Sequence, residues 1–289
     1  MKKTVRVAAI NSESKPAQTA ANLAAIDAWC KRAASEGVEL VVFPELSLTG
    51  FLPNHPLGDH AAWLREALRE ARHMAEPLDG TAVRDLSSIA RTHGLMVAAG
   101  MLEDAGNRLF NATVLVDADG LVGAWRKMHV PVFEMPFYNG GPAPDVVETR
   151  LGRIGANICF DALFPESTRL LALDSVEIVI FPFAADPAPG TAQAWMEWAA
   201  PPVRARCVEN GVFGIACNYG GHVSCAGVDQ TFPGGSFVAG PRGEILATQL
   251  AQHGMMIADL EAAVLLDARS DPDALFRFRR PEIYGRLTK

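Results

Sequence analysis

The sequence predicts a mixed α/β fold, and two observations support this prediction. Short apolar runs alternate with longer amphipathic segments through the first half of the 289 residues, which is typical of strands alternating with helices. Turn signals later in the chain separate pairs of β-rich runs, which adds hairpins to the pattern. No stretch has the composition of a linker, so we expect a single domain over residues 1–270. Residues 271–289 have few apolar partners of their own, and we expect this C-terminal tail to pack on a second subunit.

The elements of the first half each have a local signal. Val5–Ile10 is an apolar run of strand length, and apolar side chains recur at helical spacing from Leu23 to Ala33. Gly37 ends that helix, and Thr81 is a suitable N-cap for a later one. The elements predicted here are the strands Val5–Ile10, Leu40–Phe43 and Leu95–Gly100 and the helices Ala20–Glu36, Ala61–Ala75 and Thr81–His93.

The second half begins with a hairpin around the turn Asp117-Ala118-Asp119-Gly120, and a Pro- and Gly-rich loop over residues 128–144 follows. Pro201-Pro202 predicts an interruption of a helix that begins at Thr191, because proline lacks the N–H that a helix interior needs. The other predicted elements are the strands Asn111–Val116, Leu121–Arg126, Ile154–Ile158, Glu177–Phe181, Val212–Cys217, Ser236–Ala239, Glu244–Leu246 and Met255–Asp259, the helix Glu166–Leu173, a resumed helix through Glu209 and a second hairpin turn at residues 240–243.

The composition is that of a globular protein and argues against a nucleic-acid partner. Hydrophobic residues make up 49% of the chain, which is ample for one large core, and the net charge is −7 with a pI near 5.5. A nucleic-acid binder normally has a basic face. The one basic cluster, Arg277, Arg279 and Arg280, is interleaved with Phe276 and Phe278, which predicts a packed tail instead.

The five cysteines are scattered and odd in number, unlike the disulfide framework of a small secreted protein. The N-terminus, Met1-Lys2-Lys3-Thr4, runs directly into a strand-like stretch and lacks the apolar run of a signal peptide. No apolar stretch reaches the roughly 18 residues that span a bilayer. We therefore expect a cytoplasmic protein with no membrane partner.

Three reactive side chains directly follow predicted strands. Glu45 follows the second strand of the chain, Lys127 follows a strand that ends at Arg126, and Cys159 follows one that ends at Ile158. Ligands of α/β sheets bind beyond the carboxyl ends of the strands. The sequence therefore predicts that these three side chains converge on one pocket.

Glu45 and Lys127 both lie among apolar residues. Burial disfavours the charged form of a carboxylate, which suits Glu45 to general-base chemistry, although a carboxylate at a turn or helix start is an equally good interpretation of its local pattern. A lone lysine is usually solvated, but the charge of Lys127 must be paired if it is buried. Near Cys159 it would favour the thiolate, and near a substrate oxygen it would stabilise an oxyanion.

Cys159 lies in the segment Ile-Cys-Phe-Asp. A free cysteine is most often a small buried hydrophobe, and that alternative stays open on the local pattern alone. However, Cys159 stands at a strand end, and Pro165-Glu166 begins a helix soon afterwards. A sharp turn there would expose the sulfur and leave backbone N–H groups for an oxyanion hole.

A metal site is the main competing interpretation of the cysteines. Cys207, Cys217, His222 and Cys225 include possible ligands, but their spacing is not a common zinc pattern and Cys207 lies on a predicted helix. His129 is better explained as a hydrogen-bonded structural residue. We therefore expect neither a metal nor a cofactor.

Several motifs together resemble the nitrilase, or carbon–nitrogen hydrolase, superfamily. Phe-Pro-Glu-Leu-Ser-Leu-Thr-Gly-Phe (43–51) resembles its glutamate motif, Arg-Lys-Met-His-Val-Pro (126–131) its lysine motif, and Gly-Ala-Asn-Ile-Cys-Phe-Asp-Ala-Leu-Phe-Pro-Glu (155–166) its cysteine motif. Arg-Ala-Arg-Cys-Val-Glu-Asn (204–210) is similar to a helix of the same family. Three ordered motifs are far more specific than any one of them.

The resemblance implies a four-layer α-β-β-α sandwich that assembles into homodimers or larger homo-oligomers. It implies that Cys159 is the nucleophile, Glu45 the general base and Lys127 the group that stabilises the tetrahedral intermediate, together with the backbone N–H of Phe160. Glu134 matches a second glutamate that positions the lysine or the leaving nitrogen. The candidate substrate-binding residues are Phe51, Phe160 and Phe183.

The residues after the nucleophile favour one branch of this family. Nitrilases tend to have Cys-Trp-Glu, whereas Cys159-Phe160-Asp161 and the segment from Glu134 to Gly141 look like the amidase and carbamoylputrescine-amidase branches. We expect hydrolysis of a small linear amide or N-carbamoyl amine with release of ammonia. Nitrile hydrolysis, acyl transfer and a catalytically silent binding or scaffold protein are the alternatives, the last disfavoured because all three reactive residues are present.

Overall fold

Two six-stranded sheets form the body of the computed structural model, which describes residues 1–52, 60–185, 190–225 and 227–288. The first sheet contains β1 (Thr4–Asn11), β2 (Leu40–Val42), β3 (Met96–Asp104), β4 (Leu109–Asp117), β5 (Gly120–Arg126) and β14 (Gly254–Glu261). The second contains β6 (Val147–Thr149), β7 (Gly152–Ala156), β8 (Ile178–Phe183), β9 (Phe213–Asn218), β12 (Ser236–Ala239) and β13 (Ile245–Gln249). The strand orders are β14-β1-β2-β3-β4-β5 and β13-β12-β9-β8-β7-β6.

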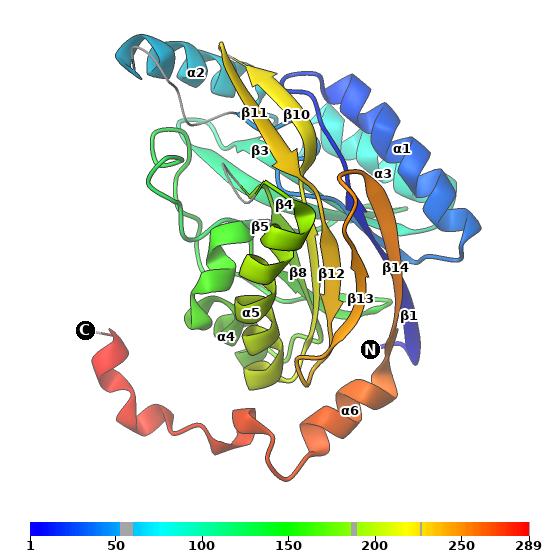
Figure 1. Ribbon diagram of the computed structural model, residues 1–289. Coiled ribbons are helices and arrows are strands. Elements are labelled where there is room, and N and C mark those ends of the chain that lie inside the picture. Colours follow the sequence, from blue (N-terminus) through cyan, green and yellow to red (C-terminus); the bar gives the residue numbers. More distant parts are fainter. Residues whose placement is uncertain (53–59, 186–189, 226, 289) are drawn as a thin grey trace.

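The helices lie outside these sheets (Figure 1). They are α1 (Thr19–Ser35), α2 (His60–Met74), α3 (Thr81–His93), α4 (Pro165–Leu173), α5 (Ala192–Asn210) and α6 (Ala262–Ser270), with 3-10 turns at η1 (Cys159–Leu163), η2 (Leu275–Phe278), η3 (Pro281–Ile283) and η4 (Gly285–Thr288). Helices α1 and α3 cover the first sheet, and α4 and α5 cover the second.

Three apolar layers hold these elements together. Side chains of both sheets, such as Val7 of β1 and Ile180 of β8, meet in the layer between the sheets. Ile26 of α1 packs on the first sheet, and Val203 of α5 packs on the second. Each large apolar side chain buried in this way contributes about 1.5–3 kcal/mol. The expected four-layer α-β-β-α sandwich is therefore confirmed.

The sheet topology brings several strand ends to the same edge. Strand β2 pairs in parallel with β1 and β3, and β8 pairs in parallel with β7 and β9. Strand β5 follows two antiparallel pairings from β3, so it runs in the same direction as β3. The chain thus leaves β2 and β5 at one edge of the first sheet, and it leaves β7, β8 and β9 at one edge of the second.

The expected break at Pro201-Pro202 was wrong, because α5 continues from Ala192 to Asn210. An internal proline costs roughly 3 kcal/mol and removes one helical hydrogen bond. Burial outweighs this cost, since Trp195, Ala199 and Val203 lie four residues apart and are fully buried against the second sheet. Their continuous apolar stripe keeps the helix in one piece.

Other boundaries also differed from the prediction. Strand β6 and a separate hairpin, β10 (Gly220–Cys225) with β11 (Val228–Pro233), were not predicted, because glycine and polar residues weaken their strand signal. Thr81 is not the N-cap of α3: Gly80 occupies that position, and the Thr81 hydroxyl accepts a hydrogen bond from Arg84 instead.

The C-terminal tail consists of short 3-10 turns that lead away from the body (Figure 1). The side chains of Leu275, Phe278, Ile283 and Leu287 are 55–73% exposed. In the described part of the chain, no helix is both long and apolar enough to cross a membrane.

Candidate active site

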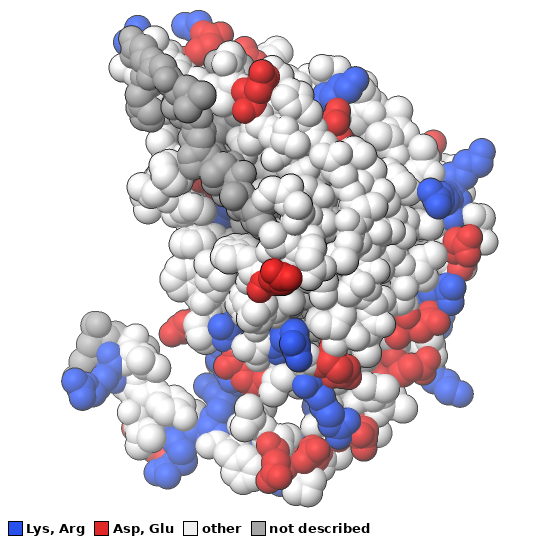
Figure 2. Space-filling model, in the orientation of Figure 1, with Lys and Arg blue, Asp and Glu red and all other residues white. Residues whose placement is uncertain are grey.

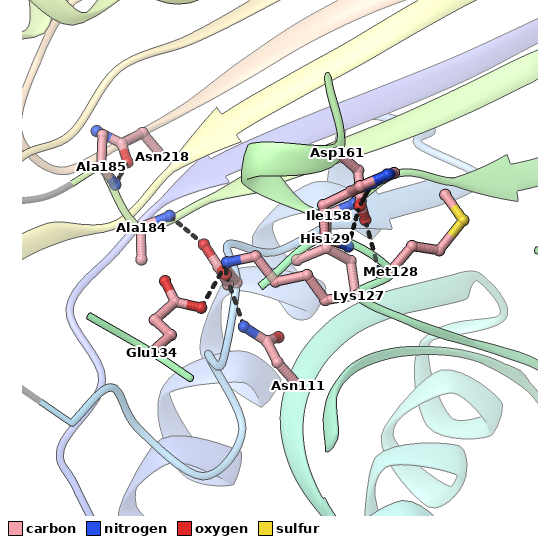
Figure 3. A network of polar contacts seen from close by, with 11 residues as sticks. Asn111, Lys127, Met128, His129, Glu134, Ile158, Asp161, Ala184, Ala185 and Asn218 are labelled. Atoms are coloured by element: carbon pink, nitrogen blue, oxygen red, sulfur yellow. Dashed lines mark hydrogen bonds and ion pairs between the residues drawn. The ribbon is translucent and has the colours of Figure 1, made fainter. Parts of the chain in front are cut away.

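Lys127 contacts both Glu45 and Glu134, and Figure 3 shows it beside Glu134. The Lys127 Nζ is 2.8 Å from Oε1 of Glu45 and 2.7 Å from Oε2 of Glu134. Glu45 and Lys127 are fully buried, and Glu134 is 6% exposed. The sequence placed the first two of these residues at strand ends, and the structure brings them together at the common edge described above.

Glu45 is held by three donors on three different elements. Its Oε1 accepts from Lys127 and, at 2.7 Å, from Nδ2 of Asn111 on β4. Its Oε2 accepts from the backbone N–H of Ala184, directly after β8, at 2.7 Å. These three donors give the carboxylate of Glu45 a fixed orientation.

The backbone turn around Glu45 depends on Gly100 of β3. A Cβ at Gly100 would lie 2.1 Å from the backbone nitrogen of Leu46 and 2.7 Å from the carbonyl carbon of Glu45. Leu46 itself has a positive φ of 55°, a backbone conformation that residues with a side chain rarely adopt. The glycine is therefore what lets this tight turn approach β3.

Lys127 carries the only positive charge of this contact group. Burial would lower the pKa of its amine, but the charges of Glu134 and Glu45 outweigh burial and raise that pKa well above its usual value. Its backbone N–H donates to the carbonyl of Asn111 at 2.8 Å, which continues the pairing of β5 with β4 by one residue. The two carboxylates thus stabilise the charged form of the buried Lys127 amine.

Cys159 is the first residue of the 3-10 turn η1 and has a positive φ of 50°. The predicted sharp turn between β7 and α4 is confirmed, but the expected exposure of the sulfur was wrong, because Cys159 is buried. A non-glycine residue in this conformation costs about 1–3 kcal/mol, and such strain often occurs at functional sites. The Cys159 side chain is 9% exposed.

The charges of Glu45, Lys127 and Glu134 all act on the thiol of Cys159. Burial, followed by the negative charge of Glu45, raises its pKa well above the usual value; Lys127 and the N–H of Ala184 oppose this without reversing it. Lys127 favours the thiolate, as expected, but burial and the two carboxylates outweigh its effect on the pKa.

The three candidate substrate-binding phenylalanines lie in different surroundings. Phe51 is buried edge-on to Phe232, with ring centroids 5.1 Å apart, and Phe183 is buried edge-on to Trp195 at 5.6 Å. Phe160 is partly exposed directly after Cys159. Their contact with substrate remains a prediction.

Several residues of the network were not anticipated. Asn111 is a polar side chain within an apolar strand, which was an available signal. Asn218, at the end of β9, accepts from the N–H of Ala185 at 2.9 Å and so steadies the segment that carries Ala184. Tyr138 is buried close enough to Glu134 and Lys127 for their charges to act on the pKa of its hydroxyl. Burial raises that pKa.

The cysteines and histidine considered as metal ligands are dispersed. In the part of the chain that the structure describes, no group of three His, Cys, Asp or Glu residues could hold a metal ion. Cys207 and Cys217 are buried in separate apolar clusters, and burial raises the pKa of both thiols. His222 is paired with Asp229 at 3.6 Å, and the side chain of Cys225 lies outside the described residues.

Comparison with known proteins agrees with this architecture. Residues 6–269 match the family described as Carbon-nitrogen hydrolase. The chain is 28% identical to a nitrilase of Pyrococcus abyssi over 98% of this chain and 100% of that protein, and 31% identical to an N-carbamoylputrescine amidase of Solanum lycopersicum over 73% and 75%.

A mutant of the amidase from Nesterenkonia sp. AN1 has the same fold, with a TM-score of 0.75, 23% identity and coverage of 98% and 97% of the two chains. That structure shows the acetamide moiety of fluoroacetamide covalently added to the active site cysteine. With two helix-covered sheets and a match over most of its length, the chain belongs to the carbon–nitrogen hydrolase family of the nitrilase superfamily.

Proposed function

We propose that this protein hydrolyses the C–N bond of a small linear amide or N-carbamoyl amine and releases ammonia. The observation that carries the proposal is the buried contact of Lys127 with Glu45 and Glu134 beside Cys159. A thiol of raised pKa within reach of the charge of a fixed carboxylate is the arrangement that general-base activation of a nucleophile requires.

In the first half of the reaction, Glu45 accepts the proton of Cys159 while the sulfur forms a bond to the carbonyl carbon. The oxygen becomes an oxyanion, which Lys127 and the N–H of Phe160 stabilise. The C–N bond then breaks, the nitrogen takes the proton from Glu45 and leaves, and a thioacyl-enzyme remains. Glu134 positions Lys127 or the leaving nitrogen.

In the second half, a water gives its proton to Glu45 and its oxygen attacks the thioester carbon. The C–S bond breaks and the proton returns to the sulfur. For an N-carbamoyl substrate, the released acid decomposes to carbon dioxide and ammonia. The covalent adduct on the cysteine of the Nesterenkonia amidase supports the nucleophile assignment by analogy.

An amide or carbamoyl substrate is favoured over a nitrile for two reasons. The residues Cys159-Phe160-Asp161 follow the amidase pattern, and the chain is 31% identical to an N-carbamoylputrescine amidase. In addition, the carboxylates of Glu45 and Glu134 can accept the N–H groups that an amide has and a nitrile lacks.

The test is ammonia release from a panel of simple amides, N-carbamoyl amines and nitriles by wild type and Cys159→Ala. We expect wild type alone to release ammonia, and Cys159→Ala to keep its fold. Carbon dioxide together with ammonia would identify a carbamoyl substrate, and release from nitriles alone would move the protein to the nitrilase class. Turnover by folded Cys159→Ala would refute the mechanism.

We propose further that the protein acts in the cytoplasm as a homodimer or larger homo-oligomer, with no nucleic-acid partner. On the face shown in Figure 2, Lys and Arg are interspersed with Asp and Glu and form no continuous basic patch. Leu173 of α4 and Trp198 of α5 are 53% and 46% exposed. The C-terminal tail stands clear of the body over part of its length, and its side chains Phe278, Ile283 and Leu287 are exposed. These exposed apolar groups support an interface between copies.

The oligomer is tested by measuring molar mass in solution for wild type, a variant that ends at residue 270 and Leu173→Asp. We expect both changes to lower the mass toward that of one chain, and a wild-type protein of 31.0 kDa would contradict the proposal.

A further inference from the structure

A buried carboxylate lies between the segments that carry Lys127 and Cys159. Asp161 is 1% exposed, and its Oδ2 accepts from the backbone N–H of Ile158 at 3.1 Å and from that of Met128 at 3.3 Å. Ile158 directly precedes Cys159, and Met128 directly follows Lys127. One oxygen atom thus touches the backbone next to both residues (Figure 3).

We propose that Asp161 is a positioning residue that sets the placement of Cys159 relative to Lys127 through these backbone hydrogen bonds. This inference rests on the proposed function, in which both residues act on one carbonyl group. Asp161 does not itself react. It acts through the two chain segments that it joins.

The need for such a link follows from the topology. Lys127 follows β5 at the edge of the first sheet, whereas Cys159 follows β7 in the second sheet. Apolar packing between sheets is non-directional, so it does not set the relative position of two loops to within a few tenths of an ångström. Hydrogen bonds to a single carboxylate are directional and short, so they can fix the relative position of the two loops.

Both oxygens of the Asp161 carboxylate take part in hydrogen bonds. Its other oxygen, Oδ1, accepts from the backbone N–H of His129 at 2.9 Å and contacts Nδ1 of the same residue at 2.8 Å. Three backbone N–H groups and one ring nitrogen therefore surround the two oxygens of this carboxylate. An amide in its place would turn an NH2 group toward donors, so Asp161→Asn keeps the shape of the side chain but breaks about half of the network.

His129 is itself fixed in orientation. Its ring stacks on Phe164 with centroids 3.9 Å apart and an interplanar angle of 10°. This hydrogen-bonded role was the expectation from the sequence, and the contact with Asp161 confirms it. His129→Phe can preserve the stacking while removing the Nδ1 contact, which makes it the milder variant.

A second possibility is that Asp161 only stabilises the turn, since its own N–H also donates to the carbonyl of Ile158 at 3.0 Å. Glu177 offers a matched control at the other end of β7: it accepts from the N–H of Arg153 at 2.9 Å and is paired with the N-terminal amine of Met1. Loss of that network would destabilise the fold without touching the link between Lys127 and Cys159.

The experiment compares wild type, Asp161→Asn, His129→Phe and Glu177→Gln in three readouts. These are kcat and KM for the best substrate of the panel, the rate of Cys159 alkylation by iodoacetamide followed by mass spectrometry, and Tm. A displacement of about 1 Å at a reacting group can cost roughly 100-fold in rate. We expect Asp161→Asn to lower kcat about 10- to 100-fold with a smaller change in KM, and to change the alkylation rate.

His129→Phe should show the same pattern more weakly, and Glu177→Gln should lower Tm while leaving kcat and alkylation within about twofold of wild type. Wild-type kcat and alkylation in Asp161→Asn would overturn the proposal, as would equal losses in Glu177→Gln. If Asp161→Asn does not fold, unchanged kcat and alkylation in His129→Phe would overturn it. If no substrate is turned over, the proposed function has failed separately, and alkylation alone decides the role of Asp161.

Discussion

The ammonium of Lys127 lies 2.8 Å from Oε1 of Glu45, and both side chains are fully buried. Removing one partner of a buried ion pair leaves an uncompensated charge, which typically costs about 3–5 kcal/mol. A second carboxylate, Glu134, is 2.7 Å from the same ammonium. The stability of this region and the proposed chemistry therefore depend on the same charge.

Lys127→Met should lower both stability and turnover. The variant leaves Glu45 and Glu134 without their cation, so we expect the free energy of unfolding to fall by about 3–5 kcal/mol, together with loss of measurable ammonia release. Urea unfolding and the amide assay measure the two effects. Lys2→Met is the control, because the exposed pair of Lys2 with Glu39 should contribute less than about 1 kcal/mol; equal losses in both variants would contradict the prediction.

Glu45→Gln, compared with a second buried carboxylate, should separate proton transfer from the loss of a buried charge. The amide cannot accept the thiol proton, so we expect kcat to fall about 10²- to 10⁴-fold. Glu103→Gln is the matched control, since Glu103 is also a buried carboxylate of the first sheet and is paired with Arg126. It should lower Tm with a much smaller effect on kcat, and near-wild-type turnover in Glu45→Gln would exclude a general-base role for Glu45.

The raised pKa of Cys159 predicts how its reactivity depends on pH. A pKa above the usual value means that little thiolate is present at neutral pH and that more forms as the pH rises. We therefore expect the rate of iodoacetamide alkylation to increase between about pH 6 and pH 9, without an acidic plateau. A constant rate over this range would instead indicate a preformed thiolate.

The same experiment has an internal control in the other thiols. Burial, together with the charge of Asp27, raises the pKa of Cys30 to about 12, and burial also raises that of Cys207 and Cys217. These three should remain unlabelled in the folded protein. Their labelling at the rate of Cys159 would show that the reaction reports on unfolding.

Gly100→Ala should disturb the site without removing any reactive group. The added Cβ would meet backbone atoms of Pro44, Glu45 and Leu46 at 2.1–2.7 Å, and backbone cannot move aside as a flexible side chain can. We expect a lower Tm and at least a tenfold lower kcat, since Glu45 must shift. Gly285→Ala is the control, because a Cβ there meets nothing within 4 Å. Normal turnover in Gly100→Ala would show that the backbone turn around Glu45 can relax.

Much of the framework could be predicted from local patterns. Strand β1 is apolar from Val7 to Ile10 because Val7 faces the layer between the sheets while Ala8 faces the helices, so both faces are buried there. The hairpin of β4 and β5 was predicted from its turn, and the helix α3 was predicted up to its C-cap Gly94. Prediction failed where burial opposed local preference, as at Pro201-Pro202.

Local sequence patterns placed Glu45, Lys127 and Cys159 each after a strand, because apolar periodicity and turn residues act over a few neighbouring positions. Long-range packing set the rest of the site. It placed β5 and β7 in different sheets, joined their ends through Asp161, and surrounded Lys127 with two carboxylates. The same packing raises the pKa of the Cys159 thiol, because a pKa depends on burial and on every nearby charge, and these come from segments that are distant in the chain.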